Sequence, residues 1–208
     1  MTTAKRKRLR PAGPPLTRED WLIAAHAAVV AGGFDQLRVL QIAKALRVSR
    51  GSFYWHFTGQ AELQEELLER WRSQQFAVDA ALRAQAATDP GADLEQVLET
   101  ALAQIGDKQE HVRFELALRG LARRDEAVAR MLAEADALRM SLFEHKFLQL
   151  TGDAHTAAEL AALFYLAVVG CYQALSRPAN PPQLKDYLQR LISTYLIQRF
   201  VPPMARRS

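Results

Sequence analysis

The segment 48–57, which reads Val-Ser-Arg-Gly-Ser-Phe-Tyr-Trp-His-Phe, limits what this chain can fold into more than any other part of the sequence. Apolar Val48, Phe53 and Phe57 recur at a spacing that can hold a short helix against other helices. The polar residues between them are left to face outward. The segment therefore predicts a helix with a hydrophobic back and a polar front.

The front of this helix combines small residues with hydrogen-bond donors. Ser49 is placed to cap the first turn, and Gly51 and Ser52 add little bulk, so the helix start can come close to base edges and phosphates. Hydroxyl, indole and imidazole donors follow in Tyr54, Trp55 and His56. Such a surface is typical of a helix that enters a DNA groove.

Two further helices are predicted upstream. Residues 37–46 form a short helix with Leu40, Ala43 and Leu46 on one side, and residues 47–49 connect it to the polar-fronted helix. A helix across 17–33 begins with a capping-box pattern at Thr17 and ends at Gly32-Gly33. Together the three helices make a helix-turn-helix head.

The head resembles the TetR family of bacterial transcriptional regulators over roughly residues 17 to 67. The resemblance is carried by Gly33-Phe34, Ile42-Ala43, the run 48–57 and Leu63. Two positions depart from the family pattern. Arg47 stands where the family usually has Gly, which implies either a left-handed residue or a turn that accommodates a side chain, and Gln60 stands where the family often has Lys.

Charge is distributed unevenly along the chain. Residues 1–60 hold ten Lys and Arg against three acids, whereas the other 148 residues hold 17 basic and 20 acidic residues. A positive end beside a mildly acidic body favours a polyanionic partner. Residues 1–15 are predicted to be a disordered basic arm that follows the minor groove or the phosphates, the alternative being a solvated tail. Its cations include Lys5, Arg6, Lys7 and Arg8.

The remainder of the chain predicts an all-α protein, in which the head of residues 16–60 precedes a larger helical bundle of residues 61–208. Apolar spacing and breaker residues place its helices at 59–86, 92–105, 109–122, 125–150, 160–172 and 184–200. The sequence shows no strand alternation and no internal repeat.

The last two helices are expected to form a homodimer through a four-helix interface, because two reading helices one DNA turn apart need a two-fold partner. The alternative is that they close a monomer core. The stretch 160–172 is uncharged but, at thirteen residues, too short to cross a membrane. The interface residues expected are Leu160, Phe164, Val168, Gly170, Tyr172, Leu184, Leu188, Leu191 and Tyr195.

The resemblance implies that the body holds a pocket for an unidentified small molecule, whose binding moves the long connecting helix and shifts the two heads. Aromatic and Met side chains that can line an apolar pocket are Trp71, Phe114, Met140, Phe143, Phe147, Phe164 and Tyr165. Each of them also fits an ordinary core position. Asp136 and Arg139 are interpreted as a helix pair rather than a polar anchor in the pocket.

Other kinds of site are weakly indicated. The pairs His111/Glu115 and His155/Glu159 have a spacing that can place two metal ligands on one helix face, but two ligands do not make a site. Cys171 is the single cysteine, which suits a buried thiol in a reducing cytoplasm. No nucleotide-binding loop or nucleophile arrangement appears, so neither a cofactor nor an enzyme is expected.

These observations favour a cytoplasmic, homodimeric regulator that binds a palindromic operator in double-stranded DNA, with repression and release by the effector as the expected mode. The base-facing candidates are Arg50, Gly51, Ser52 and Trp55, while Lys44, Arg47, Tyr54, His56 and Thr58, with the arm, are assigned to phosphates. Two alternatives remain: an architectural DNA binder without an effector, and an enzyme or carrier that retains a vestigial head.

Overall fold

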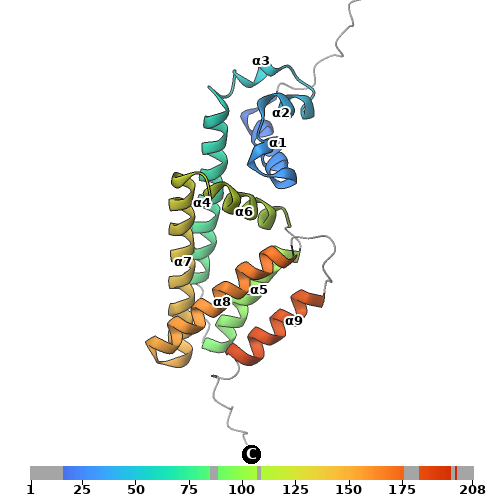
Figure 1. Ribbon diagram of the computed structural model, residues 1–208. Helices are drawn as coiled ribbons and strands as arrows, with labels where there is room; N and C mark the ends of the chain where they lie inside the picture. Colours follow the sequence, from blue (N-terminus) through green and yellow to red (C-terminus); the bar gives the residue numbers. More distant parts are fainter. Residues whose placement is uncertain (1–15, 85–88, 107–108, 176–182, 198–199, 201–208) are drawn as a thin grey trace, which may run out of the picture.

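The computed structural model describes residues 16–84, 89–106, 109–175, 183–197 and 200. Within these residues all regular structure is helical, as the sequence predicts (Figure 1). The helices are α1 (Arg18–Gly32), η1 (Phe34–Gln36), α2 (Val39–Ala45), α3 (Arg50–Phe53), α4 (Gln60–Ala84), α5 (Pro90–Gly106), α6 (Gln109–Ala122), α7 (Glu126–Thr151), α8 (Ala154–Leu175), α9 (Gln183–Ile192) and η2 (Ser193–Ile197). The basic arm of residues 1–15 lies outside the described residues.

The first helix begins and ends as its sequence predicts. The Thr17 amide donates to the Asp20 carboxylate at 2.7 Å, and the Asp20 amide donates to the Thr17 hydroxyl at 3.2 Å, which completes a capping box. At the other end the amide of Gly33 donates to the carbonyl of Val29. Gly33 has a φ of 80°, a conformation that glycine adopts without steric strain.

The second helix differs from the expected one in its start and in its buried face. It begins at Val39 rather than residue 37, because η1 intervenes and Leu37 fills the core from a loop position. Leu40, which was expected on the apolar side, is 54% exposed. Val39, Ile42 and Ala43 form the buried face instead.

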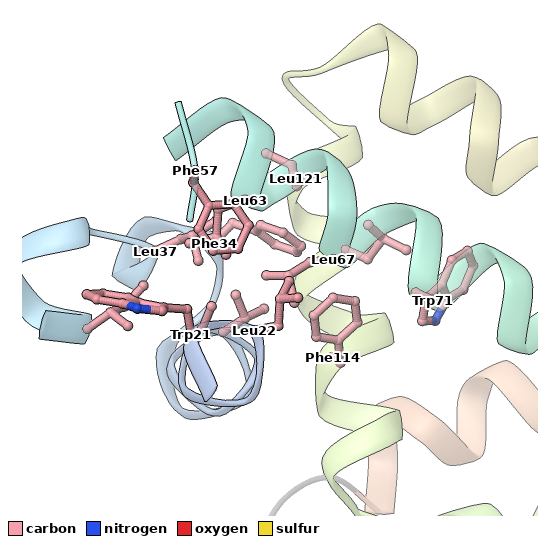
Figure 2. Close-up of a cluster of buried hydrophobic side chains, with 14 of the residues drawn as sticks. Trp21, Leu22, Phe34, Leu37, Phe57, Leu63, Leu67, Trp71, Phe114 and Leu121 are labelled. Carbon is pink, nitrogen blue, oxygen red and sulfur yellow. The ribbon is translucent and has the colours of Figure 1, made fainter. Parts of the chain in front are cut away.

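The core of the head continues into the body without a break (Figure 2). Trp21 of α1 packs edge-on against Phe53 of α3, with ring centroids 5.3 Å apart. Phe34 makes a similar contact with Phe114 of α6 at 5.6 Å. The same cluster extends to Trp71, midway along α4. Burial of these large rings holds the head at a fixed position on α4 and α6.

Ion pairs on the surface reinforce the contact between α1 and α4. Arg18 on α1 donates to Glu62 at 2.7 Å and also to Glu66, one turn further along α4. In the opposite direction, Arg70 of α4 reaches Glu19 at 2.6 Å. These side chains are partly solvent-exposed, so they add orientation more than stability.

The body packs a second core around α7 and α8, which form the most extensive helix pair. Figure 1 shows α4 running from the head into the body alongside α7, with α6 crossing near the head. A buried ion pair joins α5 to α7, where Lys146 donates to Asp93 at 2.6 Å. The long helix that begins after Asp125 is confirmed, and the Asp125 carboxylate caps it.

The helix α8 is longer than the sequence interpretation allowed. It spans 22 residues, Ala154–Leu175, so the argument that thirteen residues are too short to cross a membrane is wrong. By length and composition α8 passes the test for a membrane span, a test that a core helix of a soluble protein also passes. One face of α8 packs in the second core through Ala161, Phe164 and Val168.

Candidate functional site

The polar-fronted segment is held in place by its aromatic back. Phe53 and Phe57 are buried and stack with ring centroids 5.2 Å apart, and Val48 packs beside them. The α-helix itself is only four residues long, Arg50–Phe53. The amides of residues 54–56 continue it as a tight turn with hydrogen bonds to carbonyls three residues back. The predicted helix is therefore present but shorter, because Phe57 turns inward to close the core.

This segment and the end of α2 place a set of polar side chains on the protein surface. Trp55 is 88% exposed and Tyr54 is 51% exposed, although both are large and partly apolar. The exposed set also contains Lys44, Arg47, Ser49, Arg50, Gly51 and Thr58, while Ser52 and His56 are half-buried. We call these ten residues the reading surface. The structure brings all the DNA-binding candidates of the head together.

Arg50 and Tyr54 act as one unit in this surface. The Arg50 guanidinium donates to the Tyr54 hydroxyl at 2.9 Å and lies 5.7 Å from the centre of its ring. The sequence interpretation assigned Arg50 to bases and Tyr54 to phosphates. Because the two side chains are hydrogen-bonded, a DNA contact made by either residue would also position the other.

The capping expectation for Ser49 is wrong. The Ser49 side chain makes no capping hydrogen bond; the carbonyl of Ser49 accepts from the amide of Ser52 instead. Just before α4, the amide and the hydroxyl of Thr58 both donate to the Glu62 carboxylate at 2.7 Å. The Thr58 amide and the Arg18 guanidinium hold the pKa of Glu62 down to about 2.

Arg47 adopts the left-handed conformation, with a φ of 60°. This confirms the first of the two alternatives for the turn between α2 and α3. The amide of Arg47 donates to the carbonyl of Lys44, and the amide of Val48 donates to the carbonyl of Ala43, so the turn is closed by the backbone. A non-glycine residue in this conformation is strained, so the cation of Arg47 is kept in the reading surface at the expense of stability.

The body contains a small cavity between α4, α5, α7 and α8. Its volume is about 40 Å³, enough for roughly three water molecules. Of the expected pocket residues, Phe143 and Tyr165 line it. Phe147 and Phe164 are fully buried in the second core, and Met140 is half-buried. The other walls include Val78, Leu82, Val97, Leu142, Val168 and Tyr172.

Trp71 and Phe114 lie elsewhere. Both border a separate cleft of about 360 Å³ between the head and the body, formed by α1, α4 and α6. His26 of α1 stacks on Phe114 in this cleft, with ring centroids 4.9 Å apart. Burial lowers the pKa of His26. The predicted aromatic set is thus divided between a body cavity, a body core and the junction with the head.

A chain of charged side chains runs from the surface of the body to its cavity. The Arg119 guanidinium binds Asp136 through two hydrogen bonds of 3.0 and 2.8 Å and also donates to Glu115 at 2.8 Å. Glu115, which is fully buried, accepts two hydrogen bonds of 3.0 Å from Arg139. Burial alone opposes ionisation of Glu115, but the two guanidiniums lower its pKa overall.

Arg139 ends this chain at the wall of the cavity, where it donates to the side-chain oxygen of Gln75. The Gln75 amide in turn lies 2.8 Å from the His111 imidazole. Asp136 and Arg139 are therefore more than the ordinary helix pair that the sequence suggested, since their own separation is 3.8 Å and each has a closer partner. His111 and Glu115 do not act as a pair, because they point to different partners.

Asp79 of α4 is the site residue that sequence reasoning missed. It lines the cavity, is only 7% exposed, and its Oδ2 atom has no hydrogen-bond partner among the described residues. Burial raises the pKa of Asp79. The signal in the sequence was an acidic residue on the apolar face of α4, twelve positions after Leu67 and three before Leu82, both of which are buried.

The residues expected at a dimer interface fall into separate groups. Phe164, Val168 and Tyr172 are buried inside the protomer, so they do not lie where a partner can reach. Leu160 and Leu191 are half-buried, Gly170 is exposed and Tyr195 is 65% exposed. The side chains of Leu184 and Leu188 lie outside the described residues. The open face of α8 instead carries Leu163 and Leu166, which are 52% and 65% exposed.

The remaining candidates show no arrangement for metal or redox chemistry. Among the described residues, no group of three or more His, Cys, Asp or Glu side chains gathers as metal ligands. His155 and Glu159 form an exposed pair at 3.4 Å. Cys171 is buried, and its burial raises the pKa of the thiol to about 11. A thiol in this environment is unreactive.

Known proteins resemble this chain in sequence at the head and in fold over nearly the whole length. Residues 22–67 match the model of the bacterial regulatory proteins of the tetR family. No curated protein matches the sequence. A transcriptional regulator from Rhodococcus sp. Rha1 has a similar structure with a TM-score of 0.72 and 19% identity, covering 90% of this chain and all of the other.

Two further solved structures have the same fold. A TetR-family regulator from Agrobacterium tumefaciens has a TM-score of 0.67 at 19% identity, covering 85% of this chain and 95% of the other. A protein from Saccharomonospora viridis, solved in complex with choline, has a TM-score of 0.66 at 19% identity, covering 86% and 96%. At such identities the likeness establishes the fold.

Proposed function

We propose that this chain, whose residues 22–67 match the model of the tetR family of bacterial regulatory proteins, represses transcription by binding a palindromic operator and leaves that operator when a small molecule enters the body cavity. In this proposal the protein is a cytoplasmic regulator and not an enzyme. The observation that carries it is the reading surface, in which Trp55, Tyr54 and Arg50 stand exposed on a segment anchored by buried aromatic rings.

The reading surface suits a major groove because it combines donors, cations and aromatic faces within one short segment. Arg50 and Trp55 are proposed to face bases, since an arginine fork recognises guanine edges and an indole donates a single hydrogen bond. Lys44, Arg47 and His56 flank them and are proposed to contact phosphates, which fix register without reading sequence. Arg18 is excluded from that role, because it is bound by Glu62 and Glu66.

We propose that α8 and α9 form the dimer. Large apolar side chains remain exposed on both helices and on η2: Leu163, Leu166, Tyr187 and Tyr195. Isolated exposed leucines are normal, but such a group on adjacent C-terminal elements is typical of a protein interface. A two-fold pair through these elements presents two reading surfaces, which are needed to read the two halves of a palindrome about 34–36 Å apart. Replacement of Leu166 by Glu tests this interface, with monomer formation as the expected result.

The helix α6 is proposed to carry the signal from the cavity to the head. Its neighbouring residues Phe114 and Glu115 have different tasks: Phe114 packs on His26 and Phe34 of the head, and Glu115 holds Arg139 at the cavity wall. A ligand that moves Arg139 or Gln75 therefore also displaces α6, the helix that packs against α1. The choline complex of the Saccharomonospora viridis protein supports the expectation that this fold accepts a small molecule.

The experiment that tests the proposed function is affinity selection of random duplex DNA on the purified protein at two salt concentrations, followed by sequencing of the retained DNA. An inverted repeat with half-sites about one helical turn apart is the expected result. Retention without any motif, with a steep salt dependence, indicates an architectural binder and contradicts the proposal. Failure to retain DNA points to the carrier or enzyme alternative.

A further inference from the structure

The body cavity contains one buried carboxylate oxygen that has no hydrogen-bond partner among the described residues. The two arginines of the cluster are balanced by two carboxylates, since Arg119 pairs with Asp136 and Arg139 pairs with Glu115. Asp79 is the third carboxylate, and its Oδ2 atom has no hydrogen-bond partner among the described residues. Arg83, on the same helix, is exposed and donates to the Leu138 carbonyl at 3.0 Å.

A buried carboxylate oxygen without a partner is unfavourable in a folded protein. Leaving such a group unsatisfied destabilises the folded protein, and the destabilisation is larger when the group is charged. Apolar cores rarely keep an acid for packing alone. Asp79 is 7% exposed and lines a cavity, so a molecule that enters the cavity can supply the missing donor.

We propose, building on the proposed function, that the effector is a small ammonium ion whose N–H donates to the Oδ2 atom of Asp79. An anion is disfavoured, because Asp79 repels it and Arg139 is already bound to Glu115 and Gln75. A neutral apolar molecule leaves the carboxylate unsatisfied. Only a cation with a donor both balances the charge and completes the hydrogen bonding.

The other walls of the cavity suit such a ligand. Phe143, Tyr165 and Tyr172 line it with aromatic rings, whose faces attract cations. Val78, Leu82 and Val168 offer apolar surface to an alkyl group. At about 40 Å³, the space admits an ion of a few heavy atoms before the walls move. A larger amine will shift the walls, and Gln75 lies both in the wall and on the path to α6.

Alkylammonium ions of two to four carbons are the probes for this site. Binding is measured as the rise in melting temperature and by calorimetry, beside the alcohols of equal chain length and tetramethylammonium, which has the charge but no N–H donor. The ammonium ions should raise the melting temperature, and the two sets of controls should raise it less. An equal effect of the alcohols, or of tetramethylammonium, overturns the proposal.

Asp79→Asn removes the charge but keeps the shape of the side chain. The affinity for alkylammonium should fall about 10- to 100-fold, the range expected for a hydrogen bond to a charged group. The melting temperature without ligand should stay the same or rise, because the buried charge is gone. Glu69→Gln, an exposed change on the same helix, is the matched control and should alter neither quantity. A ligand-free Asp79→Asn protein that melts well below wild type makes Asp79 structural and overturns the proposal.

The pH dependence of binding in the unchanged protein gives a second test. Burial raises the pKa of Asp79, while Arg139 of α7 and Arg83 of α4 oppose this and Glu115 of α6 reinforces it. Protonated Asp79 cannot balance an ammonium ion, so affinity should decline as the pH falls through the Asp79 pKa. The phenols of α8 that line the cavity stay neutral there, because burial raises the pKa of Tyr165 and of Tyr172. Affinity that does not change with pH contradicts the proposal.

Binding to the protein and release from DNA are measured separately, so the two proposals fail separately. If alkylammonium binds through Asp79 but the selected operator duplex is not released, the regulatory mechanism is wrong and the ligand class stands. If the operator is bound but alkylammonium has no effect on melting, the ligand class is wrong and the regulator stands.

Discussion

The head and the body keep their polar side chains in opposite ways. The reading surface lies within residues 44–58 and is mostly exposed, and a hydrogen bond joins two of its own side chains, Arg50 and Tyr54. The chain of charged side chains in the body is buried at its centre and joins side chains up to 64 positions apart, from Arg139 to Gln75. A surface that meets DNA has its partners supplied from outside, whereas buried polar atoms must find their partners within the protein. Among the described residues that line the cavity, Asp79 is the one with a buried side-chain oxygen that lacks a hydrogen-bond partner.

The largest loss of stability is expected when Glu115, which binds both arginines of the charged chain in the body, is replaced. Glu115→Gln removes the negative charge that holds both Arg119 and Arg139, and leaves one buried cation without its partner. Breaking a buried ion pair in this way costs about 3–5 kcal/mol. Urea denaturation should show a loss of this size in the free energy of unfolding. A loss below about 1 kcal/mol would mean that water reaches the cluster, and the contrast with the exposed head would disappear.

The two regions also differ in how much of them the sequence predicts. The helix-turn-helix depends on neighbours such as Phe53 and Phe57, so local spacing was enough to place it. The cavity depends on residues of four helices that approach only in the folded chain. Asp136 and Arg139 looked like a helix pair because they are three residues apart, but their closest partners are Arg119 and Glu115. Contacts between side chains on different helices cannot be predicted from the spacing of residues along one helix.

Smaller mismatches have the same physical origin. Leu40 fits the apolar spacing of α2 yet is exposed to solvent, because α2 begins after η1, at Val39, and buries the face that carries Ile42 and Ala43. Phe164, Val168 and Tyr172 were assigned to the dimer because α8 is apolar nearly all round. The sequence of such a helix does not indicate which of its sides packs against the protein's own core. In the structure these three residues face that core.

Replacement of Arg50 by Ala should give the next largest effect. The preference for one base in the operator should relax, with a loss of about 1–3 kcal/mol for the preferred sequence and little for a non-specific one. Tyr54→Phe frees Arg50 from its 2.9 Å hydrogen bond. It should therefore weaken binding to all sequences and also reduce the preference for that same base. Competition binding with single-base operator variants measures both.

A double-mutant cycle decides whether Arg50 and Tyr54 form a unit. If the two substitutions add without interaction, the contact seen in the free protein is lost on DNA, and the division into base and phosphate contacts holds as the sequence suggested. If Tyr54→Phe relaxes base preference without lowering affinity, the assignment of Tyr54 to phosphate is wrong.

Arg47→Gly should separate stability from binding in the head. Arg47 has a φ of 60°, which glycine adopts without strain, so the substitution should stabilise the fold by about 1 kcal/mol. If Arg47 contacts a phosphate, DNA affinity should fall on every sequence and the salt slope should decrease by about one. Arg47→Asn, which tolerates the same backbone but has no charge, is the control. Unchanged salt slopes in both variants would remove Arg47 from the interface.

The smallest effect is expected for Glu62→Gln at the contact between α1 and α4. The Thr58 amide and Arg18 lower the pKa of Glu62 to about 2, from an ordinary value near 4.5. A carboxylate with a depressed folded pKa stabilises the protein above the unfolded pKa, and this contribution is lost as the pH falls from about 4.5 toward 2. Because Glu62 is accessible to solvent, its contribution is screened and should be modest.

Comparison of wild type, Glu62→Gln and Glu69→Gln by denaturation at neutral and acidic pH gives the measurement. Glu62→Gln should be the less stable protein at neutral pH and should approach wild type in acid. A constant difference across this range would show that the hydrogen bonds of Glu62, rather than its charge, orient the head on α4.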